Sequence, residues 1–188
     1  MSTVGADEPM AIPAEFVAQL ATTRRRVRVV AVLALVFGVF ALVYMLRMAL
    51  GGIAGAITMA KLGFLGAGAI GMGIGLGLLA FSGGARSAGA VWFVAWGLLN
   101  LVVGFAAALS GDALMGIFAL VTGAMHLLFA SVIGSQDAVF LCDYLGGNLA
   151  LDQIREGVRL AAGDGSPEMA LFLSTVLTTT PPRAGAPD

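Results

Sequence analysis

The polar side chains best suited to chemistry inside the apolar stretches of this sequence are Asn100, Thr122 and His126. Asn100 and Thr122 each lie 11 residues from Gly111, so two helices meeting in a hairpin at this glycine would hold them at similar depth. His126 follows Thr122 by one helical turn and shares its face. Polar side chains in lipid need partners, and interhelical hydrogen bonds contribute roughly 0.6–2 kcal/mol each. We therefore interpret the three residues as an intramembrane polar cluster that joins two helices.

His126 also has functional alternatives: a proton-responsive group, a metal ligand, or a contact for haem or quinone. One imidazole without a second His, Cys or carboxylate nearby is a poor metal site. Catalysis needs a nucleophile or an acid/base pair held together, whereas the acids of this chain fall in its termini and loops. Cys142 is the single cysteine, so neither a CxxC motif nor an intramolecular disulfide is available. We expect a protein that is not an enzyme, with no catalytic, cofactor or metal site.

Glycine is concentrated in one apolar stretch between Lys61 and Arg86. Six glycines there are expected to pack against neighbouring helices: Gly66, Gly68, Gly71, Gly73, Gly75 and Gly77. At about 100° per residue, Gly66, Gly73 and Gly77 face one side of a helix and the other three nearly the opposite side. Small residues let helix backbones approach closely in membranes. Contact on both sides would suit either the middle of a bundle or a subunit contact in an oligomer.

The helices that carry these residues are expected to cross a membrane. Of the 188 residues, 59% are hydrophobic and 11% are charged, against about 25% charged residues in soluble domains. A crossing of about 30 Å needs about 20 apolar residues in a helix, and four stretches approach this length: 29–46, 62–85, 87–110 and 113–136. We predict an all-α integral membrane four-helix bundle. Residues 48–60 are too few for a full crossing and predict a short interfacial or re-entrant helix.

The basic residues predict the orientation, because positive charge near span ends is held on the cytoplasmic side. Only Arg47 and Lys61 fall near the span ends on one side of the predicted membrane. The other side collects five arginines: Arg24, Arg25, Arg26, Arg28 and Arg86. Both termini would then be cytoplasmic. The preference for Arg over Lys, with abundant Ala, Gly and Val, favours a bacterial source and hence the inner membrane. A net charge of −1 argues against nucleic-acid binding.

Amphipathic segments are predicted on the cytoplasmic side at both ends of the 27–136 transmembrane domain. Residues 1–26 form an N-terminal segment with Phe16 and Leu20 on one face of a short helix. Residues 137–188 form a tail with two helices, for which Asn148 is a predicted N-cap and Ser166 a predicted start.

Two functions follow as hypotheses. The first is a non-enzymatic anchor or accessory subunit that presents its cytoplasmic amphipathic segments to a partner protein in a membrane complex or to membrane lipid. The alternative is a small homo-oligomeric channel or carrier, assembled through the glycine-rich second span and lined by the polar cluster.

Overall fold

The computed structural model describes residues 12–50 and 59–178. These residues form seven α-helices and one π-helical turn, and no β-strand occurs among them, so the all-α prediction is confirmed. Residues 51–58 form most of the segment predicted as interfacial or re-entrant and lie outside the described residues. The flanking residues 48–50 and 59–60 belong to the helices on either side.

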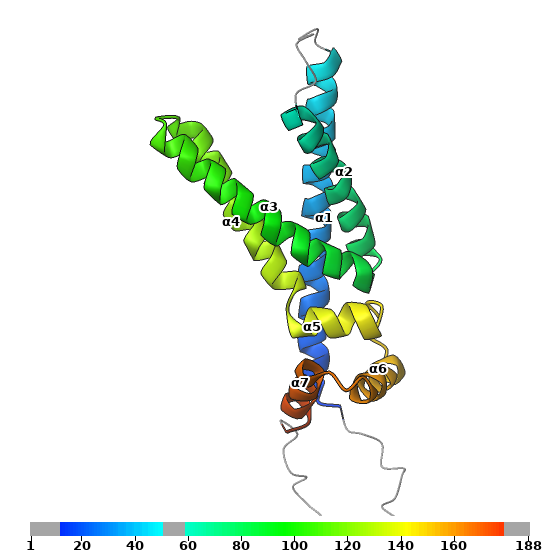
Figure 1. Cartoon of the computed structure of the whole chain (residues 1–188). Helices are drawn as coiled ribbons and strands as arrows, with labels where there is room; N and C mark the ends of the chain where they lie inside the picture. The colour runs from blue at the N-terminus through cyan, green and yellow to red at the C-terminus, as the bar shows by residue number, and fades with distance from the viewer. Residues whose placement is uncertain (1–11, 51–58, 179–188) are drawn as a thin grey trace, which may run out of the picture.

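The first helix, α1 (Ala14–Leu50), is 37 residues long, about 55 Å at 1.5 Å per residue. It runs without a break through the boundary that the sequence suggested at residue 26. Residues 14–26 of the predicted amphipathic segment and the first span therefore form one continuous helix (Figure 1). The arginine cluster lies in the first half of this helix.

The membrane helices form two antiparallel hairpins. One consists of α1 and α2 (Met59–Leu79), and the other of α3 (Gly83–Leu109) and α4 (Ala113–Ile133). Figure 1 shows that the hairpins meet near their lower ends and diverge toward the opposite ends. A bundle of four helices along their whole length is therefore not confirmed.

Three of the described helices are long and apolar enough to cross a membrane: Ala14–Tyr44, Gly83–Leu109 and Ala113–Ile133. The apolar part of α2 found in the described residues, Leu65–Leu79, is shorter. These lengths are consistent with a multi-pass membrane protein.

The turn between the second and third membrane helices lies earlier than the sequence suggested. The predicted spans, 62–85 and 87–110, put Arg86 in the turn, whereas α2 ends at Leu79 and α3 begins at Gly83. Ser82 ends the turn because its hydroxyl accepts a hydrogen bond from the Ala85 backbone N–H as the N-cap of α3. Arg86 thus lies in the first turn of a helix.

The α3–α4 hairpin is closed by glycines that bring the two backbones into contact. A Cβ atom added to Gly104 would lie 2.9 Å from the backbone nitrogen of Leu120 and 3.0 Å from the carbonyl oxygen of Gly116. A Cβ on Gly123 would lie 2.9 Å from the carbonyl oxygen of Gly97. Both helices therefore repeat a glycine contact after seven residues, about two helical turns.

The α1–α2 hairpin uses the same spacing. A Cβ on Gly38 would lie 2.8 Å from the carbonyl oxygen of Gly68, and a Cβ on Gly75 would lie 2.9 Å from that of Ala31. Ala31 and Gly38 on α1, like Gly68 and Gly75 on α2, are seven residues apart. Each hairpin is thus held at two levels by small residues.

The chain after α4 folds back onto the start of α1 as four short elements: α5 (Gln136–Val139), the π-helical turn η1 (Phe140–Tyr144), α6 (Leu151–Gly163) and α7 (Pro167–Thr178). We call residues 136–178 the helical cap. Its core contains Phe16 of α1, whose ring centroid lies 5.8 Å from that of Phe140 and 5.7 Å from that of Phe172. Leu20 and Ile154 are fully buried in the same cluster. The N-terminal segment and the tail therefore cover one another's apolar faces.

The two helix starts predicted in the tail have different outcomes. Ser166 accepts a hydrogen bond from the Met169 backbone N–H at 3.2 Å, at the beginning of α7. Asn148 is not the N-cap of α6, which is Ala150. Asn148 instead accepts from the Ala150 backbone N–H at 3.2 Å, so its side chain closes a turn before the helix begins.

The glycine contacts predict that substitution by valine destabilises the protein more at Gly104 than at Gly73. Gly104→Val should destabilise the protein by about 1–3 kcal/mol, because its branched side chain would meet the α4 backbone. Gly73→Val places the same side chain where no atom lies within 4 Å and should have little effect on the isolated chain. Thermal unfolding in one detergent measures both, and equal losses would contradict the assignment of the close contact to Gly104.

Candidate functional site at the junction of the membrane helices and the cap

His126 lies where the two hairpins meet and is 9% exposed. Its ring is surrounded by three phenylalanines, with centroid separations of 6.5 Å to Phe37 of α1, 5.8 Å to Phe93 of α3 and 6.1 Å to Phe129 of α4. Its Nδ1 atom lies 2.7 Å from the carbonyl oxygen of Thr122 in the same helix. His126 therefore contributes to the packing between the two hairpins.

Asn100 and Thr122, the other two members of the predicted polar cluster, also make their contacts within their own helices. The Asn100 amide donates to the carbonyl oxygen of Trp96 at 2.8 Å, and Thr122 meets His126 through its backbone. Among the hydrogen bonds of the described residues, none joins Asn100 to Thr122 or His126. The Asn100 amide and the His126 ring therefore each bond to a backbone carbonyl of their own helix.

The six glycines of α2 divide by what they face. Gly68, Gly71 and Gly75 face α1, and Gly77 faces Ala85 at the start of α3. A Cβ on Gly66 or Gly73 would have nothing within 4 Å. One side of α2 is thus packed along its described length, while the other side is packed only near the turn to α3.

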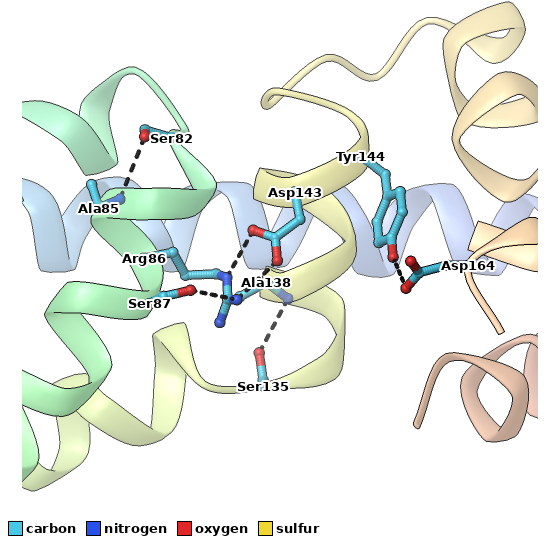
Figure 2. Close-up of polar contacts among 9 residues, drawn as sticks. All are labelled: Ser82, Ala85, Arg86, Ser87, Ser135, Ala138, Asp143, Tyr144 and Asp164. Atoms are coloured by element: carbon cyan, nitrogen blue, oxygen red, sulfur yellow. Dashed lines mark hydrogen bonds and ion pairs between the residues drawn. The ribbon is translucent and has the colours of Figure 1, made fainter. Parts of the chain in front are cut away.

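An ion pair joins the membrane helices to the cap (Figure 2). The Arg86 side chain donates from Nε to Oδ1 of Asp143 at 3.1 Å and from a terminal nitrogen to Oδ2 at 2.9 Å. Their side chains are 12% and 30% exposed. Paired bonds of this kind orient both groups as well as binding them. Gly83 permits the approach, since a Cβ there would overlap the Asp143 carboxylate.

Two further carboxylates accept hydrogen bonds that stabilise the cap. Asp137 of α5 accepts from the Gln19 amide of α1 at 2.8 Å and from the Thr23 hydroxyl at 3.4 Å. Tyr144 donates to Asp164 at 2.6 Å, and this hydrogen bond raises the pKa of the phenol to about 12. Figure 2 shows that Tyr144 and Asp143 leave the same π-helical turn in different directions.

A shallow cavity of about 220 Å³ opens between α1, α5 and α7. Its wall includes Glu15, Gln19 and Asp137 beside the apolar Phe16 and Phe172. Within residues 12–50 and 59–178, no three His, Cys, Asp or Glu side chains are grouped as a metal site would need.

Cys142 belongs to η1 in the cap and is 5% exposed. Burial raises the pKa of its thiol to about 11, the Arg86 guanidinium lowers it by less, and Asp143 adds a smaller rise. At pH 8 only about one thiol in a thousand would be ionised while the cap stays closed, and the thiolate is the reactive form.

Sequence reasoning did not identify Asp143 as the partner of Arg86, because 57 residues separate them. One signal was present: Arg86 is the single Lys or Arg residue between Lys61 and Arg155. A lone base beside a membrane span needs either lipid headgroups or an acid. The fold of the cap determines that this acid is Asp143.

Comparison of the chain with protein-family models, curated proteins and solved structures gives no match.

Loss of the ion pair should loosen the cap. We expect Arg86→Gln to speed alkylation of Cys142 by iodoacetamide at pH 8 about tenfold or more, corresponding to about 1.4 kcal/mol less stability of the closed cap. The guanidinium lowers the thiol pKa, so its removal alone would slow the reaction. Faster alkylation therefore reports opening of the cap.

Arg159→Gln is the matched control, because it breaks an exposed ion pair with Glu156 within α6 and should leave the alkylation rate unchanged. An unchanged or slower rate in Arg86→Gln would show that the pair does not hold the cap closed.

Proposed function

We propose that this protein is a non-enzymatic membrane anchor or accessory subunit, which carries a folded helical cap on one side of the membrane for contact with a partner protein. The observation that carries the proposal is the packing of the cap on Phe16 and Leu20 of α1. One continuous helix thus belongs both to the membrane part and to the cap. A partner bound to the cap would be held at a defined distance from the bilayer.

The arginines favour a cytoplasmic location for the cap and both termini. Arg24 to Arg28 and Arg86 lie beside the cap, whereas Arg47 and Lys61 lie toward the far ends of α1 and α2. The positive-inside rule then assigns the cap to the cytoplasm. Together with the preference for Arg over Lys, this favours the bacterial inner membrane. In this proposal α2 is a fourth crossing, and lipid or other subunits close the hairpins into a bundle.

The surface offered to a partner differs from the one expected from the sequence alone. The apolar faces of residues 12–23 and 148–177 are largely buried in the cap, so the outer faces of the same helices remain for binding. The outer face of α6 carries the exposed Arg155 and Arg159, the exposed acids Asp152 and Glu156, and Leu160, which is 46% exposed. Arg159 pairs with Glu156, whereas no ion pair of Arg155 occurs within the described residues. A face of mixed charge and apolar area suits a partner whose charges complement this pattern, with an acid opposite Arg155.

The test uses the full chain, a chain ending at Thr178, and the charge reversal Arg155→Glu with Arg159→Glu. Co-purified proteins are quantified after mild solubilisation. We expect the partner to remain with the chain ending at Thr178 and to be lost from the charge-reversed protein, which keeps the buried face of α6. Removal of residues 148–188 should also abolish the association without preventing membrane insertion. An unchanged set of co-purified proteins in both the charge-reversed protein and the chain lacking residues 148–188 would contradict the proposal.

The alternative is a small oligomeric channel or carrier assembled through α2. It is favoured by Gly66 and Gly73, which lie seven residues apart with open space beside them. The glycines that close both hairpins have this same spacing. The polar cluster would then contribute to a path between subunits.

For this alternative, native mass spectrometry should detect an oligomer, and Gly73→Leu should convert it to monomer because the side chain would fill the contact. Gly163→Leu in the cap, where a Cβ also meets nothing within 4 Å, should leave the oligomer intact. A monomeric unsubstituted protein would count against the channel or carrier.

A further inference from the structure

The turn between α2 and α3 holds Phe81 in an unusual position against two arginines. Phe81 has φ of +52°, a conformation that bulky side chains seldom adopt and that persists only where surrounding structure enforces it. Its ring is 5% exposed. The guanidinium carbons of Arg24 and Arg28 lie 5.7 Å and 5.6 Å from the ring centroid. Two cations of α1 thus share one aromatic ring.

The ring is fixed from the cap side as well. Gly147 lies so close that a Cβ there would overlap the Phe81 side chain. Gly147 has φ of +78°, so both the space and the backbone conformation favour glycine. Three segments, namely α1, the α2–α3 turn and the loop before α6, therefore meet at Phe81.

Within residues 12–50 and 59–178, the charges of Arg24 and Arg28 are not neutralised by an ion pair. The acids of the adjacent α5 and η1 are engaged elsewhere, Asp137 by Gln19 and Thr23 and Asp143 by Arg86. The Nε–H group of Arg24 is buried without a hydrogen-bond partner. A buried unpaired donor on a cation is costly, and the charge of an anion beside the guanidinium group would offset part of that cost.

The position of Arg28 beside the apolar part of α1 indicates which kind of anion would bind there. Arg28 immediately precedes the apolar part of α1, and Val32 and Val36 continue from it at one-turn spacing while 49% and 56% exposed. An anion held by Arg28 would therefore lie next to a helix face suited to an acyl chain. Guanidinium groups bind phosphate through paired hydrogen bonds, and phosphodiesters are the anionic groups of phospholipids at this depth.

We propose that Arg24, Arg28 and the ring of Phe81 form a binding site for the phosphate of an anionic phospholipid. The ring holds the two guanidinium groups in place, and their terminal N–H groups donate to the phosphate. The acyl chains lie along the exposed valines of α1. This site is independent of the proposed partner contact, because it requires only that α1 cross a bilayer.

The test compares retention of phosphatidylglycerol and phosphatidylcholine by the full chain in detergent, measured by native mass spectrometry. We expect Arg24→Gln with Arg28→Gln to lower phosphatidylglycerol retention about tenfold, as loss of charge-assisted bonds would. Arg25→Gln with Arg26→Gln removes the same charge from the same helix, away from Phe81, and should retain the lipid. Equal losses in the two pairs would overturn the site, because they would reflect general attraction to the basic cluster.

A pair of charge-conserving substitutions to lysine provides a second test if the glutamine variants fail to insert into the membrane. Arg24→Lys with Arg28→Lys loses the planar groups that stack on Phe81, and its phosphatidylglycerol retention should fall below that of Arg25→Lys with Arg26→Lys. Equal retention by the two lysine pairs would overturn the proposal. Inorganic phosphate should not displace the lipid, and full displacement at millimolar phosphate would overturn the assignment to a phospholipid.

Discussion

Helices in lipid gain little by exchanging contact with acyl chains for contact with one another, so their pairing depends on close approach of their backbones. Both hairpins of this protein meet that constraint with small residues repeated after seven positions on each helix. Gly104 and Gly116 meet near the turn of one hairpin, and Gly38 and Gly68 meet in the other. The depth and register of the remaining membrane residues, including His126, follow from these contacts.

The second organising element is α1, because it is shared by the membrane part and the cap. Its first turns supply Phe16 and Leu20 to the core of the cap, and its later turns face the glycines of α2. The Arg86–Asp143 pair provides a separate connection between the cap and α3. Movement of the cap would therefore involve both hairpins.

The chemistry of the protein is concentrated at the membrane boundary. His126 sits within an aromatic cluster inside the membrane part and bonds to its own helix. By contrast, the region where the membrane helices meet the cap holds a paired arginine, Arg86, and two arginines on Phe81 for which no ion pair occurs among the described residues. This distribution supports the two proposals, namely contact of the cap with a partner protein and binding of a phospholipid.

The sequence by itself determined the elements whose signals are local. Apolar length predicted membrane-crossing helices, and the serine before Pro167 marked the start of α7. Contacts between distant segments were decided by the tertiary structure: Arg86 reaches Asp143, and the tail covers the first turns of α1. An amphipathic pattern shows that a face will be buried but does not identify what buries it, so the partner of residues 12–23 was not readable. Likewise, helical periodicity placed six glycines on two sides of α2, whereas only the arrangement of α1 and α3 decided which of them are covered.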